Sequence, residues 1–210
     1  MVGWGLLELT SSSPHLRDHV IACGAISPLL GIIDTAPEDE AATSAASVLC
    51  SLASGGPSHQ VAIAREGGVP VLGRLLSLGI GQPKSGAVEV AAWALQKLAA
   101  GQGAIQEEVR SSGALADLTV ALAIGLDDET TEKVAWALYE CAAGNRASCS
   151  AVVVLGGVSS LVRDVLLARD AAPAVLKAGL WALCTLASGC ESAREQAGAL
   201  GALDWLAHLL

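Results

Sequence analysis

The chain has 210 residues, of which 52% are hydrophobic and only 3% aromatic, and its formal net charge at pH 7 is −9. This length suits one large domain or one repeat array, and an aromatic-poor chain rich in Ala and Leu favours closely packed helices over strands. Affinity for a phosphate backbone comes from clustered Lys and Arg, so an acidic chain without a basic run argues against a nucleic-acid-binding protein. The acidity suits a basic partner, and it also serves solubility alone.

Two sequence markers recur in phase along the chain. The first is a glycine followed by a short apolar run, at Gly24, Gly68, Gly113, Gly157 and Gly201, in steps of 44, 45, 44 and 44 residues. The second is a helix-like segment that reads VGWGLLELTSS at 2–12, AASVLCSLASG at 45–55, VAAWALQKLAAG at 90–101, VAWALYECAAG at 134–144 and GLWALCTLASG at 179–189. Two markers held in phase predict an array of repeats with a period of about 44 residues.

We therefore expect a single repeat domain over residues 1–210. Its predicted parts are the end of a truncated repeat at 1–13, full repeats at 14–56, 57–101, 102–145 and 146–189, and a truncated repeat at 190–210. The chain starts inside one unit and stops inside another, and no polar capping repeat is evident at either end. Because solenoid repeats bury their faces only against neighbours, we expect the chain to be a fragment of a longer array.

Each unit reads as three helices. The first is short, at 16–22, 59–65, 104–110, 146–154 and 192–197, and it ends at the marker glycine, which can adopt the left-handed closing conformation. The second helix follows at once, with Pro28 and Pro70 in its first turn, where the missing N–H costs nothing. The third helix is the longest, and it opens on acids in two copies, at 38–40 and 127–129.

This unit resembles the armadillo repeat. The matching residues are GAISPL at 24–29, GVPVL at 68–72 and AAWALQKLA at 91–99. The resemblance implies an all-α fold, a right-handed α-solenoid superhelix of about four to five armadillo repeats, with three helices per repeat. HEAT repeats are the lesser alternative, because they have two helices and usually lack the glycine marker.

No sequence motif indicates catalysis, and we expect no cofactor, no metal site and no small-molecule substrate. The segment GIGQPKS at 79–85 has the wrong spacing for a phosphate-binding loop, and Pro83 stands where the lysine needs a glycine before it. The six Cys show no zinc spacing, and Cys50, Cys141 and Cys184 fall inside copies of the third helix. We expect these thiols to be small buried apolar groups in a reducing compartment.

The armadillo resemblance implies a concave groove lined by the third helices, where a partner peptide lies. Equivalent positions form a row, roughly 10 Å apart from helix to helix, which suits every third residue of an extended peptide. The row holds Trp4, Ser47, Trp93, Trp136 and Trp181. Tryptophan offers an apolar plate, a ring face for Lys or Arg, and one N–H donor. The structural alternative is that these rings fill gaps between repeats, and we expect Trp205, in a second helix, to serve packing alone.

The row resembles the tryptophan ladder by which importin-α-type arrays hold basic peptides, with one departure. That family carries an Asn four residues after each Trp, whereas the positions here hold Glu8, Ser51, Lys97, Glu140 and Thr185. One turn before the Trp residues stand charged side chains, so the candidate groove residues are Trp4, Glu8, Glu89, Trp93, Lys97, Glu132, Trp136, Glu140, Lys177, Trp181 and Thr185.

These observations predict a non-catalytic protein–protein interaction scaffold that binds an extended peptide or partner protein, with a basic peptide as one candidate. A nuclear-transport adaptor that recognises basic peptides is one alternative, although the missing Asn residues weaken it. A membrane-associated armadillo adaptor is another, although Val2 stands where N-terminal acylation requires glycine. We expect no direct insertion into a membrane and a cytoplasmic location, with the nucleus as an additional compartment.

Overall fold

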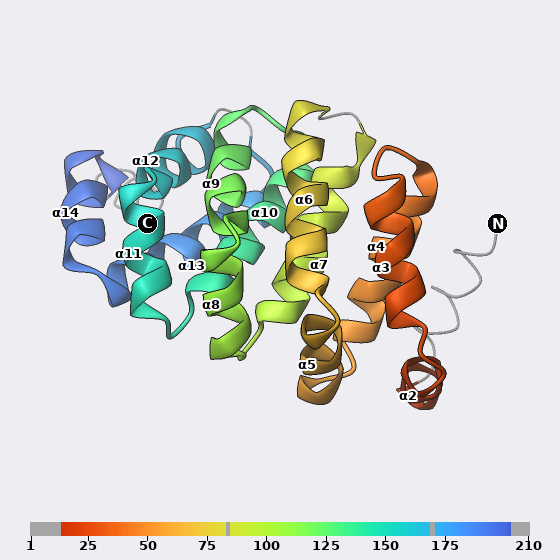
Figure 1. Ribbon diagram of the computed structural model, residues 1–210. Helices are drawn as coiled ribbons and strands as arrows, with labels where there is room; N and C mark the ends of the chain where they lie inside the picture. Colours follow the sequence, from red (N-terminus) through yellow and green to blue (C-terminus); the bar gives the residue numbers. More distant parts are fainter. Residues whose placement is uncertain (1–13, 83–84, 169–170, 203–210) are drawn as a thin grey trace.

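The protein is described by a computed structural model that covers residues 14–82, 85–168 and 171–202. Every regular element in these ranges is helical, and they contain no strand, in agreement with the predicted all-α class (Figure 1). Trp4, Glu8 and Trp205 lie outside the described residues, so the predictions made for them stay predictions.

The helices follow the predicted three-per-unit order. The first helices are α2 (Pro14–Ala22), α5 (Pro57–Arg65), α8 (Gly103–Ser111), α11 (Arg146–Val154) and α14 (Glu191–Ala199). The second helices are α3 (Ile26–Thr35), α6 (Gly68–Gly81), α9 (Ala114–Ala123) and α12 (Gly157–Ser160), which continues as the π-helix η2 (Leu161–Leu166). The third helices are α4 (Glu40–Ala53), α7 (Ala87–Ala99), α10 (Asp128–Ala142) and α13 (Pro173–Gly189).

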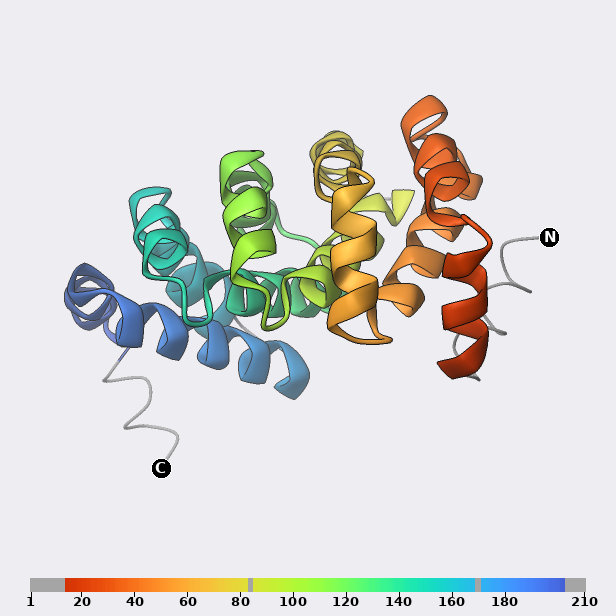
Figure 2. The ribbon, with the colours of Figure 1, turned by 60° about the horizontal axis from the view of Figure 1, so that its bottom comes forward.

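Second and third helices form two layers of the solenoid. Each second helix packs on the next one along the chain, and so does each third helix, which gives the curved stack seen from two sides in Figures 1 and 2. The apolar side chains lie between the layers. On α7 one apolar stripe, formed by Ala91, Ala94, Leu95 and Leu98 at helical spacing, is buried, with at most 1% of any of these residues exposed. The small Ala side chains let neighbouring third helices approach closely.

The turn between first and second helices differs from the prediction in two of the repeats. Gly24 and Gly113 do adopt the left-handed conformation, with φ of +74° and +87°. In the second and fourth repeats, however, the left-handed residue is the preceding glycine, Gly67 or Gly156. The marker residue Gly68 is needed for a different reason, because a Cβ there would lie 2.6 Å from Cγ2 of Ile63. The second glycine of each Gly-Gly pair thus allows a close approach to the first helix.

The third-helix thiols are not all buried, and the expectation for Cys184 was wrong. Cys50 and Cys141 are fully buried, whereas Cys184 is exposed. Cys50 and Cys184 occupy equivalent positions, each three residues after a member of the groove row. Cys50 is covered because α7 packs against α4. In the described part of the chain no third helix follows α13, so nothing equivalent covers Cys184.

Candidate functional site

Three tryptophans of the predicted row lie on neighbouring third helices. Trp93 is on α7, Trp136 on α10 and Trp181 on α13. The first two are half-buried against the core, while Trp181 is 51% exposed. The difference has the same cause as for Cys184, because α7 and α10 are each followed by another third helix and α13 is not, within the described residues. The row therefore combines packing with a solvent-facing apolar surface.

Tyr139 joins two of these rings into one aromatic cluster. Its ring centroid lies 5.6 Å from that of Trp136, with 86° between the planes, and 6.0 Å from that of Trp181, with 73° between the planes. These are edge-to-face contacts, which stabilise aromatic pairs beyond the area they bury. Sequence reasoning missed Tyr139, although its position three residues after Trp136 places both on one face of α10.

Lys133 covers the ring of Trp93. Its Nζ lies 5.6 Å from the ring centroid, which is within range of a cation–π contact. The residue was not predicted to be part of the site, and its position three residues before Trp136 is the only sequence signal for it. The face of Trp93 that we expected to offer to a peptide cation is thus already in contact with a cation of the same chain.

Acidic side chains gather around this contact. Burial is the main cause that raises the pKa of Glu89, and the negative charges of Glu129 and Asp127 raise it further, while Lys133 opposes them. The indole Nε1–H of Trp136 donates to Oε1 of Glu132 at 3.3 Å. The surface formed by α7 and α10 is therefore mainly acidic, and its two lysines are Lys133 and Lys97.

Lys97 and Glu140 stand at two of the positions where importin-α-type arrays carry Asn, and the backbone carbonyl of each accepts a hydrogen bond from a buried glutamine. Burial raises the pKa of Glu140, and the nearby charge of Lys97 opposes that shift. Gln60 Nε2 donates to the carbonyl oxygens of Lys97 and Ala100 at 2.7 and 3.3 Å. Gln106 Nε2 donates in the same way to Glu140 and Ala143, at 2.7 and 3.0 Å. Each glutamine satisfies carbonyls that the end of a helix leaves free.

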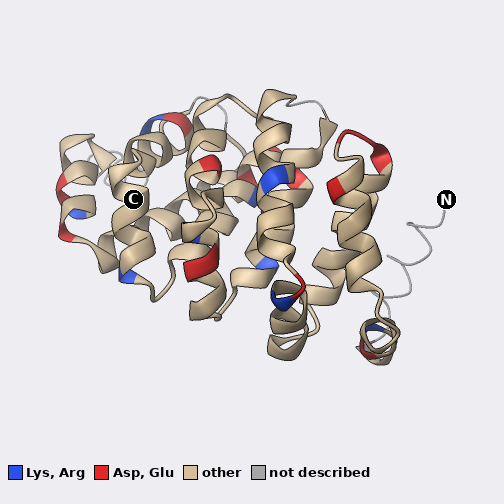
Figure 3. Ribbon diagram, viewed as in Figure 1, with Lys and Arg blue, Asp and Glu red and all other residues tan. Residues whose placement is uncertain are grey.

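The structure thus brings six of the predicted groove residues together on α7 and α10, namely Glu89, Trp93, Lys97, Glu132, Trp136 and Glu140. Trp181 and Thr185 lie on α13, where both line a hollow of about 610 Å³ that α10, α11 and α14 also border. Lys177 is exposed on α13. Over the ribbon as a whole, Lys and Arg are scattered and form no continuous stripe within the described ranges (Figure 3).

The cysteine thiols differ in pKa because they differ in burial and in hydrogen bonding. Burial raises the pKa of both Cys50 and Cys141 to about 12. Cys190, at the edge of the hollow, has a lowered pKa, first because of its hydrogen bond with the Ser192 hydroxyl, at 2.9 Å, and then because of nearby backbone N–H groups. The two buried thiols are therefore inert at neutral pH, and Cys190 is the readier nucleophile.

In the described part of the chain, no group of three or more His, Cys, Asp and Glu side chains is arranged to hold a metal ion. No single helix there is long and apolar enough to cross a membrane, although two bent helix pairs reach the required length and composition.

Comparison with known proteins identifies the fold. Residues 57–100 match the model of the armadillo/beta-catenin-like repeat family. An engineered protein from the Northeast Structural Genomics Consortium aligns with a TM-score of 0.87 and 29% identity, over 99% of this chain and 81% of that one. A designed armadillo repeat protein in complex with the peptide (KR)4 aligns with a TM-score of 0.86 and 26% identity, over 99% of this chain and 83% of that one. No curated protein matches the chain significantly.

Proposed function

The chain is an armadillo-type solenoid, and we propose that it is a non-catalytic protein–protein interaction scaffold that binds an extended peptide along its third helices. The observation that carries the proposal is the row of aromatic side chains on adjacent third helices, from Trp93 through Trp136 and Tyr139 to Trp181. The similar designed armadillo repeat protein in complex with (KR)4 supports a peptide as the ligand class.

The chemistry of the row suits an extended ligand. Ring faces and edges provide apolar contact for alternate peptide side chains, and neighbouring third helices are spaced to meet about every third one. Trp181 is exposed and offers a ring without displacement of any side chain of the protein. The carboxylates near Trp93 and Trp136 favour a peptide that carries Lys or Arg over this part of the surface.

A nuclear-transport adaptor for basic peptides is the second candidate. The observation that favours it is the acidic stretch between α7 and α10, where the negative charges of Glu129 and Asp127 lie close enough to raise the pKa of Glu89. The six cysteines are all free, which supports a reducing compartment, and the proposal therefore includes a cytoplasmic location with access to the nucleus.

The proposal is tested by binding of fluorescently labelled (KR)4, measured by anisotropy with increasing salt. We expect saturable binding that weakens as salt screens the acidic stretch. The double variant Trp93→Ala plus Trp136→Ala should lose affinity by about tenfold or more, since two aromatic contacts are removed. Trp93 and Trp136 are half-buried, so their removal can also affect folding. Trp181→Ala is therefore measured as well, since its exposed ring can be removed with little effect on folding.

Leu78→Ala is the matched control, since it removes an exposed apolar side chain from the second helix α6. It should leave binding unchanged. Equal affinity of all four proteins for the peptide would show that the aromatic row is not the binding surface. Absence of any binding at low salt would remove the basic-peptide candidate.

A further inference from the structure

We propose that the hollow between α10, α11, α13 and α14 is a second subsite of the same surface, one that accepts an Asp or Glu side chain of the bound peptide. This inference rests on the proposed function. It makes the ligand bipolar, with a basic part over α7 and α10 and an acidic part at α13 and α14.

The hollow has the size and the lining of a side-chain pocket. Its volume is about 610 Å³, within the range of ligand pockets. Tyr139 and Trp181 form an aromatic wall, and Thr185 and Ser188 on α13 add hydroxyl groups. This lining provides apolar contact for the stem of a side chain and hydrogen-bond donors for its end.

Two guanidinium groups make the hollow attractive to an anion. Arg146 and Arg194 both line it, and neither makes an ion pair with any described residue. Arg194 is held in place because its Nη1 donates to the carbonyl oxygen of Ala187 at 2.6 Å. Since guanidinium groups bind carboxylates through paired N–H donors, two unpaired ones facing the same hollow indicate a carboxylate ligand.

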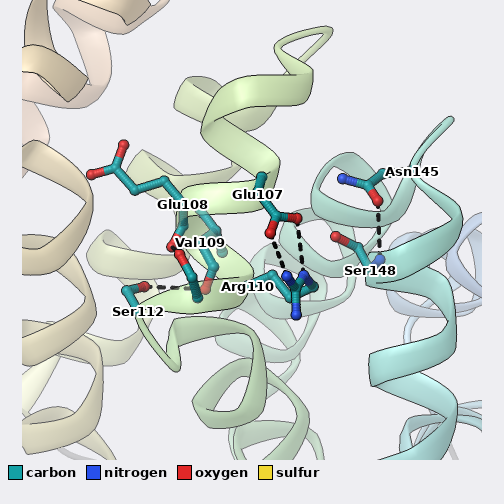
Figure 4. A network of polar contacts seen from close by, with 8 residues as sticks. Glu107, Glu108, Val109, Arg110, Ser112, Asn145 and Ser148 are labelled. Carbon is teal, nitrogen blue, oxygen red and sulfur yellow. Dashed lines mark hydrogen bonds and ion pairs between the residues drawn. The ribbon is translucent and has the colours of Figure 1, made fainter.

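Arg110, on the neighbouring first helix, differs from these two arginines because its guanidinium makes an ion pair with a carboxylate. Arg110 on α8 bonds to both carboxylate oxygens of Glu107, with Nε to Oε2 at 3.0 Å (Figure 4). Arg146 begins α11 directly after Asn145, whose Oδ1 accepts the N–H of Ser148 at 3.1 Å. That cap fixes the start of the helix but leaves the guanidinium of Arg146 without an acidic partner.

The charge of the hollow favours a carboxylate over a phosphate. Glu191 is the one acid among its lining residues, so the two arginines and this glutamate leave a net charge of +1. A side-chain carboxylate carries one negative charge and balances it, whereas a phosphorylated residue carries about −1.5 to −2 and would exceed it. We therefore assign the subsite to Asp or Glu.

The two parts of the surface then fix the direction of the peptide. Glu132 lies beside Trp136 on α10, and Glu89, Glu129 and Asp127 surround the Trp93 side of the surface. A bipolar peptide placed in the opposite direction would bring its acidic residues to these carboxylates, and like charges in contact are unfavourable. One order of charges along the peptide should therefore bind better than the reverse order.

The test compares labelled twelve-residue peptides by anisotropy. Each has six alternating Lys and Arg residues joined to six alternating Glu and Leu residues, in both orders, and each is matched by a peptide with Gln in place of Glu. We expect that in one order the Glu peptide binds about fivefold or more tightly than its Gln match. Arg146→Gln plus Arg194→Gln should remove this gain.

Two further variants serve as controls. Arg163→Gln removes an exposed arginine from η2 and should leave the gain unchanged. Arg146→Gln alone keeps the Arg194 hydrogen bond and should give a partial loss, which separates the charge effect from any local loosening of α14.

A footprint on the thiols gives an independent readout. Cys184 and Cys190 line the hollow, and Cys23 is exposed after α2, far from it along the chain. The bound Glu peptide should slow alkylation of Cys184 and Cys190 by iodoacetamide and leave Cys23 unchanged.

The inference is overturned if Glu and Gln peptides bind equally in both orders, or if the gain persists in the double arginine variant. Failure of every peptide to bind, the basic (KR)4 included, would instead overturn the proposed function and this subsite with it.

Discussion

At the residue scale, the contact between Lys133 and Trp93 decides how strongly a basic peptide can use the surface. A peptide cation must displace Lys133 from the ring, and an exposed cation–π contact contributes about 0.5–1 kcal/mol. Lys133→Ala should therefore bind (KR)4 about two- to fivefold more tightly, since it opens the ring and makes the acidic stretch more negative. Anisotropy titration measures this directly.

Lys177→Ala is the matched control for this variant. It removes one positive charge from the next third helix, where the lysine is exposed and not in contact with Trp93. It should change the affinity less than Lys133→Ala does. Weaker binding of (KR)4 by Lys133→Ala would mean that the lysine assists the peptide and does not compete with it.

The sequence predicted which residue types line the third helices but not which of their side chains contact one another. The positions of Trp93, Trp136 and Trp181 follow from the repeat period, because equivalent residues of stacked helices fall in register. The partner of Trp93 belongs to the next repeat, and a long lysine side chain has many rotamers, so no local pattern identifies Lys133. Exposure of Cys184 likewise depends on a neighbouring helix and not on its own sequence.

At the scale of the element, buried glutamines connect the first helix of a repeat to the end of its third helix. Gln106 is 3% exposed and donates to two carbonyl oxygens at the end of α10. Gln106→Ala leaves those carbonyls without donors, and we expect a loss of about 1–3 kcal/mol in the free energy of unfolding. Urea denaturation followed by circular dichroism measures it.

The control for that loss is Gln196→Ala, which removes an exposed glutamine from α14. It should change the free energy of unfolding by less than about 0.5 kcal/mol. Equal stability of Gln106→Ala and the unsubstituted protein would show that water satisfies the α10 carbonyls as well as the glutamine does.

The helices themselves were largely predictable, and the exceptions have local causes. Glycine markers, apolar spacing and opening acids place α5, α6, α8, α9 and α10 within two residues of their observed starts. Helix α7 begins at Ala87, three residues before the segment predicted at 90–101. The sequence could not show that Gly67, and not Gly68, is the left-handed residue, since either glycine of a pair can adopt that conformation. The π-helical turn at Leu161–Leu166 carries no signal in the sequence, because its apolar spacing resembles that of the other second helices.

At the scale of the whole molecule, contacts are made between neighbouring units. The third helices α7 and α10 each pack on a third helix at both sides, whereas α4 and α13 have such a neighbour on one side within the described ranges. In such a solenoid, stability is close to a sum of repeat terms and nearest-neighbour interface terms. Units with two interfaces are therefore held more firmly than units with one.

This arrangement predicts a gradient of hydrogen-exchange protection along the chain. Amides of α6, α7, α9 and α10 should exchange most slowly, and those of α2 and α14 faster by about tenfold or more, since they open by local unfolding. Hydrogen exchange with mass spectrometry of peptic fragments measures the gradient. Uniform protection across the described helices would show that the array unfolds as a single cooperative unit. In that case, Gln106→Ala, which lowers the free energy of unfolding, should lower protection equally in α2, α7 and α14. If the repeats unfold locally instead, the decrease in protection should be found mainly in α7 to α11.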